Sequence, residues 1–211
     1  YSRVRSVRAS PFPLGLIVPM EIDRRRLTNQ IAAGCLAAIT RPLSGATPGT
    51  SIYTTGKRGP KSFHLLRIRP DGGVETLGNL KGRAHGLTFS PQSSSLTVFA
   101  RRPGTFAVTL SDAAQASFEV ATNLRLNGHG TYSPDGSQIF ATANDYEAGR
   151  GVILQIDAAT GRPIARWPSG GLGCHEVILG ADQRHLIVAN GGVKTHPDYP
   201  RVKLNLDTLR S

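Results

Sequence analysis

Three histidines with glycine close by recur at a regular interval. His85, His129 and His175 are 44 and 46 residues apart, and in each copy an apolar run, a turn and a second apolar run follow the histidine. A neutral imidazole nitrogen is a good ligand for copper or iron. These intervals are far longer than those of a local metal motif, so only a fold that brings equivalent points together could build a site from them.

The repeat itself predicts the fold class. After the first copy, residues 105–110 and 117–121 form two more strand-like runs, and after the second copy residues 151–157 and 163–167 do the same. Four strands in about 45 residues are typical of one blade of a β-propeller of the WD40 or YVTN kind. The alternative is a β-sandwich with coincidental spacing. We therefore predict an all-β chain of radially arranged sheets.

The number of blades predicts an incomplete ring. Residues 51–82 match the later strands of an earlier blade, and the last copy ends in residues 203–209, which we expect to lie inside its third strand. Residues 50–211 thus supply about three and a half blades, whereas a propeller has at least four. Because an open arc would leave unpaired sheet edges, we expect the chain to be a truncated piece of a longer protein.

The first fifty residues read as a leader and not as part of the fold. From Met20 the chain has three arginines at 24–26, a modest apolar stretch at 31–39 and small residues at 44–46. This is the layout of an export signal, and the arginines resemble the twin-arginine type. We predict that residues 1–19 are upstream and non-native, that residues 20–49 are a signal peptide, and that the protein is periplasmic. A short amphipathic helix with a basic end is the alternative.

Composition excludes several classes of protein. The net charge is +11, but beyond residue 50 the basic residues are scattered in runs no longer than two, which argues against a nucleic-acid groove. No apolar run reaches the roughly 18 residues of a transmembrane helix. Two cysteines do not indicate a disulfide framework. The chain has no zinc-protease histidine pair, no dinucleotide fingerprint and no nucleophile elbow.

Strand direction predicts which residues share a face. Successive blade strands alternate in direction, so the histidines and the ends of the second strands lie together, opposite the Ser133–Gly136 turn. The candidate metal ligands are His85, His129 and His175. The candidate ligand-binding residues on the same face are Arg101, Asn144, Asp145, Glu147, Arg150, Glu176, Asn190 and His196.

A structural role for the histidines is the competing interpretation. Each could hydrogen-bond within its own blade, as the Gly-His pair of WD repeats does. Ring nitrogens within about 5 Å of one another would favour a metal, whereas separations above about 10 Å would need a larger ligand. Asn144 and Asn190 share a repeat position and could close their loops by side-chain hydrogen bonds. Cys174 could be a soft ligand or a reactive thiol, although a small-residue substitution is the simpler explanation.

Several segments together resemble a known family. They read GRAHG at 82–86, YSPDG at 132–136, NDYEAGRG at 144–151, VANGG at 188–192 and KLNLD at 203–207. This pattern, from about residue 50 to the end, resembles the bacterial domain-of-unknown-function family 1513. The resemblance implies a seven-bladed periplasmic propeller, often encoded near imelysin-type iron-uptake proteins, with no established activity. The chain departs from the family in lacking the last blades and in having Cys174 where proline is expected.

We therefore expect a binding or scaffold protein of periplasmic metal handling, with an iron or copper ion on the histidine-bearing face and iron-uptake proteins as its partners. One alternative is a metal-dependent redox enzyme or lyase at the same place. The other is an interaction platform that binds no small ligand.

Overall fold

The computed structural model describes residues 4–8, 19–20, 49–112, 115–199 and 202–208, and this part of the chain is all-β. The predicted export signal, apart from Met20 and the last residue before position 50, lies outside the described residues. None of the described helical segments has the length and hydropathy needed to cross a membrane.

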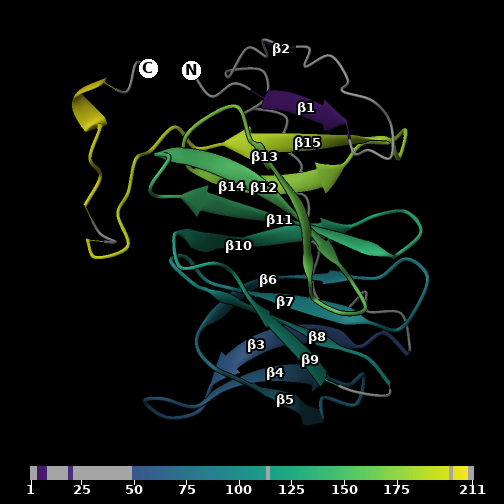
Figure 1. Ribbon diagram of the computed structural model, residues 1–211. Coiled ribbons are helices and arrows are strands. Elements are labelled where there is room, and N and C mark those ends of the chain that lie inside the picture. The colour runs from purple at the N-terminus through teal and green to yellow at the C-terminus, as the bar shows by residue number, and fades with distance from the viewer. Residues whose placement is uncertain (1–3, 9–18, 21–48, 113–114, 200–201, 209–211) are drawn as a thin grey trace, which may run out of the picture.

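Four antiparallel sheets succeed one another along the chain (Figure 1). The first contains β3 (Ile52–Lys57), β4 (Phe63–Ile68) and β5 (Val74–Leu80). The second contains β6 (Ala84–Phe89), β7 (Leu96–Ala100), β8 (Phe106–Leu110) and β9 (Gln115–Glu119). The third contains β10 (Leu124–Tyr132), β11 (Gln138–Asp145), β12 (Arg150–Asp157) and β13 (Pro163–Pro168). The fourth contains β14 (Cys174–Leu179), β15 (His185–Asn190), β1 (Val4–Arg8) and β2 (Pro19–Met20).

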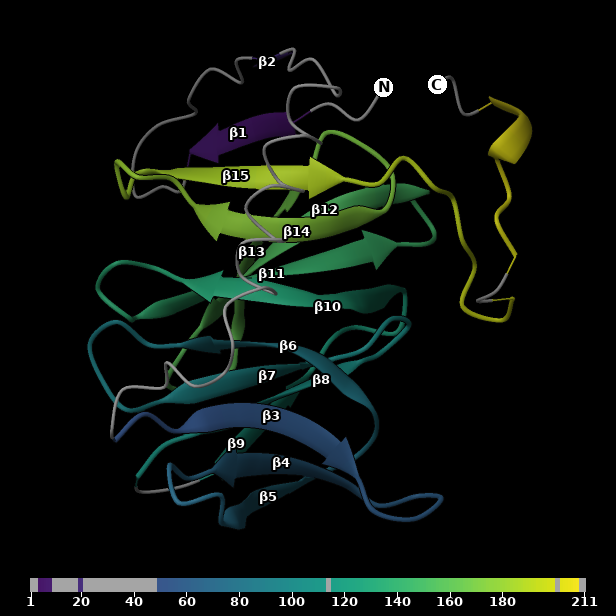
Figure 2. The ribbon, with the colours of Figure 1, turned by 180° about the vertical axis from the view of Figure 1, so that it is seen from behind.

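The sheets are the blades of a β-propeller, as the repeat predicts. Each sheet packs on the next through its first strand, with β6 against β10 and β10 against β14 (Figure 2). The first sheet holds three described strands in the order β3-β4-β5, and β5 leads into β6 as β9 leads into β10. Its strands therefore correspond to the second, third and outermost strands of the complete sheets.

Apolar side chains fill the spaces between neighbouring sheets. One buried cluster joins the first and second sheets, another joins the second and third, and a third joins the third and fourth. The last of these contains Phe140 of β11 together with Val177 of β14 and Leu186 of β15. Each buried side chain of this size contributes about 1.5–3 kcal/mol through removal of apolar surface from water. Packing between sheets therefore fixes the positions of the inner strands.

The glycines beside the histidines permit close approach of the inner strands. Gly128 has a φ of 98°, and a Cβ added there would lie 2.9 Å from the Cβ of His85 in the neighbouring sheet. A Cβ added at Gly86 would collide with the carbonyl oxygen of Gly128. Glycine is the residue that accepts both the positive φ and the contact, so these positions bring two histidine-bearing strands together.

The end of the chain differs from the prediction. Residues 203–209 were expected inside a third strand, but the structure has a 3-10 helix at Leu206–Thr208, and β1 occupies the third place by pairing with β15. The reason lies in Asn205, whose side chain accepts a hydrogen bond from the Lys194 amide at 2.7 Å and donates one to the Gly192 carbonyl at 2.9 Å. These bonds fold the segment back on the stretch after β15. That residues 1–19 precede the natural start stays a prediction.

Candidate functional site

The three repeated histidines lie side by side. The ring centroids of His85 and His129 are 4.8 Å apart, and those of His129 and His175 are 4.7 Å apart. They come from β6, β10 and β14, the inner strands of three successive sheets. The apolar run after each histidine predicts an inner strand that begins after the histidine; this was wrong, because each histidine lies within its strand.

A β-bulge positions each of these rings. The ladder register shifts between Ala84 and Leu87, between Leu126 and Gly130, and between Cys174 and Glu176. A bulge bends its strand and re-aims the side chains there. The same irregularity at three equivalent positions explains why the rings converge. Sequence analysis missed it, although the glycines beside the histidines were a signal for it.

The His129 ring is held from the neighbouring sheet. Its Nδ1 lies 2.8 Å from Oε2 of Glu176 on β14, and its Nε2 is buried with no hydrogen-bond partner among the described residues. In the neutral tautomer that donates Nδ1–H to the carboxylate, Nε2 carries a free lone pair. An imidazole whose second nitrogen donates to a carboxylate is the usual arrangement of a metal-ligating histidine.

The candidate ligand atoms are close enough to share one ion. The nitrogen and oxygen atoms offered by His129, His175 and Glu176 all lie within 4.8 Å of one another. A separation below about 5 Å is the one expected for a metal site. His85 is a fourth group, which contacts the His129 ring. The alternative, in which each histidine hydrogen-bonds within its own blade, does not apply to His129, because its ring pairs with Glu176 of the neighbouring blade.

Electrostatics favour neutral rings beside a charged carboxylate. Burial, followed by the positive charge of neighbouring His129, lowers the pKa values of both His85 and His175 below the ordinary value. Burial alone would raise the pKa of Glu176, but the hydrogen bond and charge of His129 outweigh it and leave that pKa below its usual value. The directions of these shifts favour the neutral forms of His85 and His175 and the charged form of Glu176, which are the forms that bind metal ions.

Polar groups behind the rings fix the backbone that carries them. The Thr142 hydroxyl on β11 lies 3.1 Å from the His129 carbonyl oxygen and 3.3 Å from that of His175. Asn127 donates to the Cys174 carbonyl at 2.5 Å and accepts from Asn144 at 3.1 Å. The strands β10, β11 and β14 are therefore joined at the level of the site.

A cavity of about 400 Å³ opens over His85 and His175. Its lining joins His85 and His175 with residues of the loop after β7 and of the segment after β15. The remaining lining residues are Arg101, Arg102, Pro103, Asn127, Tyr146, Thr195 and His196. Among the residues predicted to bind a ligand, Arg101 and His196 line this cavity. Sequence analysis did not single out Asn127, Tyr146 or Thr195. Tyr146 does lie in the segment that best matches the family pattern.

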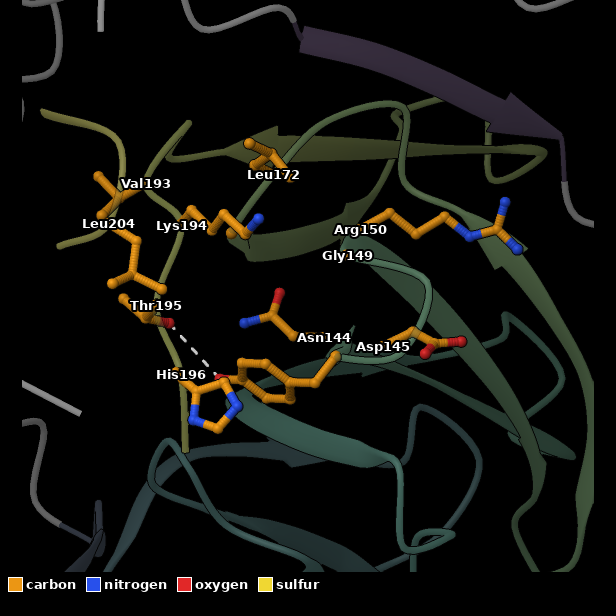
Figure 3. Close-up of a pocket in the computed structure, with 12 residues that line it drawn as sticks. Asn144, Asp145, Gly149, Arg150, Leu172, Val193, Lys194, Thr195, His196 and Leu204 are labelled. Carbon is orange, nitrogen blue, oxygen red and sulfur yellow. Dashed lines mark hydrogen bonds between the residues drawn. The ribbon is translucent and has the colours of Figure 1, made fainter. Parts of the chain in front are cut away.

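A second, smaller cavity of about 50 Å³ lies next to the first, between the turn after β11 and the segment after β15. Figure 3 shows Asn144 pointing into it, Thr195 and His196 on the facing segment, and Arg150 extending away. The Tyr146 and Thr195 hydroxyls are 3.5 Å apart across it. His196 and Tyr146 line both cavities.

The other predicted residues are occupied within the fold or lie apart from the rings. Asp145, 3% exposed, accepts hydrogen bonds from Arg166 at 3.2 Å and from the Ala148 amide at 3.0 Å. Asn190 is buried, accepting from the Ser169 hydroxyl at 2.6 Å and donating to the Ser169 carbonyl at 3.0 Å. Glu147 is exposed and lines neither cavity.

Cys174 is expected to be unreactive in the native protein. It is a free thiol in the core cluster behind β14, on the face of the strand opposite to His175, and burial raises its pKa to about 12. In a Cys35→Ser background, a thiol reagent at pH 8 should label almost none of the folded protein and all of the protein unfolded in urea. Rapid labelling of the folded protein would restore the interpretation as a soft ligand.

The fold and site define a β-propeller with a histidine cluster on its inner strands. The profile of the family described as a protein of unknown function, DUF1513, matches residues 78–211. This is more than half of the sequence, and the chain belongs to that family. No curated protein matches it.

Solved structures with partial similarity include a gluconolactonase, TolB and a luciferin-regenerating enzyme. A gluconolactonase from Xanthomonas campestris is 17% identical with a TM-score of 0.49, over 69% of this chain and 52% of that chain. TolB from Acinetobacter baumannii is 20% identical with a TM-score of 0.41, over 72% and 39%. A luciferin-regenerating enzyme is 15% identical with a TM-score of 0.44, over 73% and 62%. The chain spans 39% to 62% of the length of these three structures.

Proposed function

We propose that this propeller binds one transition-metal ion on its inner strands and serves metal handling in the periplasm. The single observation that supports the proposal most directly is the buried, unpartnered Nε2 of His129, whose Nδ1 is held by Glu176. A buried polar atom without a partner costs about 1–3 kcal/mol, so its presence here requires a reason. An ion between His129 and His175 would satisfy that atom.

The ligand types narrow the choice of ion. Imidazole ligands suit copper, iron or zinc and do not suit calcium or magnesium, which prefer oxygen ligands alone. In this proposal His129 and His175 hold the ion, Glu176 orients His129, and His85 lies against the His129 ring without joining the ligand set. The periplasmic location is supported by the twin-arginine-like segment and remains part of the proposal.

Metal titration tests the proposed function. Protein stripped with a chelator would be titrated with Cu²⁺, Zn²⁺ and Fe²⁺ at pH 7.5, following heat and bound metal per chain. We expect one ion per chain, bound tightest for Cu²⁺ in accordance with the general order of stability, and weaker binding in the His175→Gln variant. Failure of all three ions to bind would leave the interaction-platform alternative.

The metal-free protein should lose stability as the pH falls below the usual histidine value. The folded-state pKa values of His85 and His175 are lowered, so below about pH 6.5 the unfolded chain takes up protons before the folded chain does. The contribution of the two neutral histidines to the free energy of unfolding is therefore fully present above about pH 6.5. It is lost as the pH falls toward their lowered folded-state pKa values.

Urea unfolding at pH 7.5, 6.5 and 5.5 measures this dependence. The double variant His85→Gln, His175→Gln should show a smaller acid loss than the wild type. His64→Gln removes one imidazole far from the cluster, at the Ser62 and Asn79 hydrogen bonds, and serves as the matched control. An unchanged acid loss in the double variant would contradict the expectation.

A further inference from the structure

Two neighbouring guanidinium groups in the larger cavity have no counter-charge. Arg101 and Arg102 are exposed on the loop after β7, and within the described part of the chain no ion pair or side-chain hydrogen bond engages either of them. Among the described residues the cavity lining contains no carboxylate, although the Asp198 carboxylate lies 3.6 Å from Nδ1 of the lining residue His196. The nearby Glu176 is already paired with His129, and Asp145 with Arg166. The cavity is therefore a cationic recess.

The guanidinium groups act electrostatically on the histidines. Arg101 and Arg102 line the same cavity as His85 and His175. A cation beside a metal site opposes the binding of a bare metal cation. The two guanidinium groups therefore disfavour binding of a metal ion alone, and they favour binding of the ion together with negatively charged ligands.

Hydroxyl and imidazole groups complete the recess. The Tyr146 and Thr195 hydroxyls both reach this region and are joined only by a long contact of 3.5 Å. The His196 ring lies between Tyr146 and Tyr199, with centroids 5.9 Å from each. A volume of about 400 Å³ is in the lower range of small-molecule pockets and suits a small ligand.

We propose that this cavity binds a small di- or tricarboxylate anion, with one carboxylate on Arg101 and Arg102 and further oxygens directed to the ion at the histidines. Guanidinium groups recognise carboxylates through two parallel hydrogen bonds. Carboxylate oxygens are suitable additional ligands for iron or copper held by imidazoles. The protein would then take up the metal as an anionic chelate. This inference deepens the proposed function by naming its ligand class.

Citrate is the probe that tests the anion site. Its binding would be measured calorimetrically on metal-free protein and on protein loaded with one equivalent of Cu²⁺. The double variant Arg101→Met, Arg102→Met should bind citrate at least about tenfold more weakly, since it loses the charge-assisted hydrogen bonds to the carboxylate. Arg162→Met is the matched control, because it removes the same charge from the turn between β12 and β13, on the opposite face. Urea unfolding verifies that each variant is folded.

The outcomes separate this inference from the metal proposal. Arginine-dependent citrate binding to metal-free protein would support the anion site even where no metal binds. A variant with Arg101→Lys and Arg102→Lys should recover only part of the affinity, since lysine keeps the charge without the paired geometry. Absence of citrate binding in both forms, or equal affinity in the wild type and the double methionine variant, would overturn the inference even where Cu²⁺ binds.

Discussion

Replacing His129 with glutamine is expected to weaken metal binding by about 100-fold or more. His129 is the middle ring of the cluster, and it supplies a buried lone pair that no group in the described part of the chain uses. Glutamine keeps much of the volume and polarity of the side chain but offers a far weaker ligand atom. The effect should exceed that of Glu176→Gln, because loss of a group that orients a ligand costs about 10- to 100-fold.

Competition with a chelator of known affinity measures these constants at pH 7.5. The matched control is His196→Gln, which removes an imidazole from the cavity wall and leaves the three clustered rings in place. It should change the affinity for the ion alone by less than about threefold, which corresponds to roughly 0.6 kcal/mol. Wild-type affinity in the His129→Gln variant would show that the ion binds elsewhere.

Replacing Phe140 with alanine is expected to lower the free energy of unfolding by about 3–5 kcal/mol. Phe140 on β11 is 1% exposed and packs between the third and fourth sheets, with the Trp167 ring centroid 6.3 Å away. Its removal forfeits apolar burial and leaves a cavity that the rigid sheets cannot close. Since a small domain has about 5–15 kcal/mol of stability in total, the variant should be close to unfolding.

Urea denaturation followed by tryptophan fluorescence is a direct measurement, because Trp167 is the single tryptophan and adjoins Phe140. The same change at Phe89, which is 47% exposed and touches Tyr53 edge-on at 5.0 Å, should cost about 1 kcal/mol. If Phe140→Ala and Phe89→Ala lowered the free energy of unfolding equally, packing between the third and fourth sheets would not determine the stability of the protein.

The architecture was predictable because each blade repeats a local pattern. Alternation of apolar residues and the Ser-Pro-Asp-Gly turn locate β10 and β11, and the repeat interval places His85, His129 and His175 at equivalent points. Because successive strands alternate in direction, the histidines can be assigned to one face of the propeller from the sequence alone. These inferences depend on backbone geometry, to which local sequence is closely tied.

The individual side-chain partners were less predictable, because they depend on contacts between sheets. Asp145 and Glu176 are both acidic residues on the predicted face, yet one is buried against Arg166 and the other orients His129. No local pattern distinguishes these two environments. The residues from Lys203 to Asp207 alternate like a strand, but hydrogen bonds from Asn205 to a distant segment prevent one from forming.

The pairing of His129 with Glu176 connects two blades that also meet through apolar contacts and through the Asn127 and Thr142 hydrogen bonds. An ion held at that point would fasten β10 to β14, and its occupancy would add to the cohesion of the joint by about 2.7 kcal/mol at a hundredfold excess over its dissociation constant. Conversely, a slight rotation of one blade against the other would separate the ligand atoms and release the ion. Affinity for the ion would thus depend on the relative positions of the third and fourth sheets.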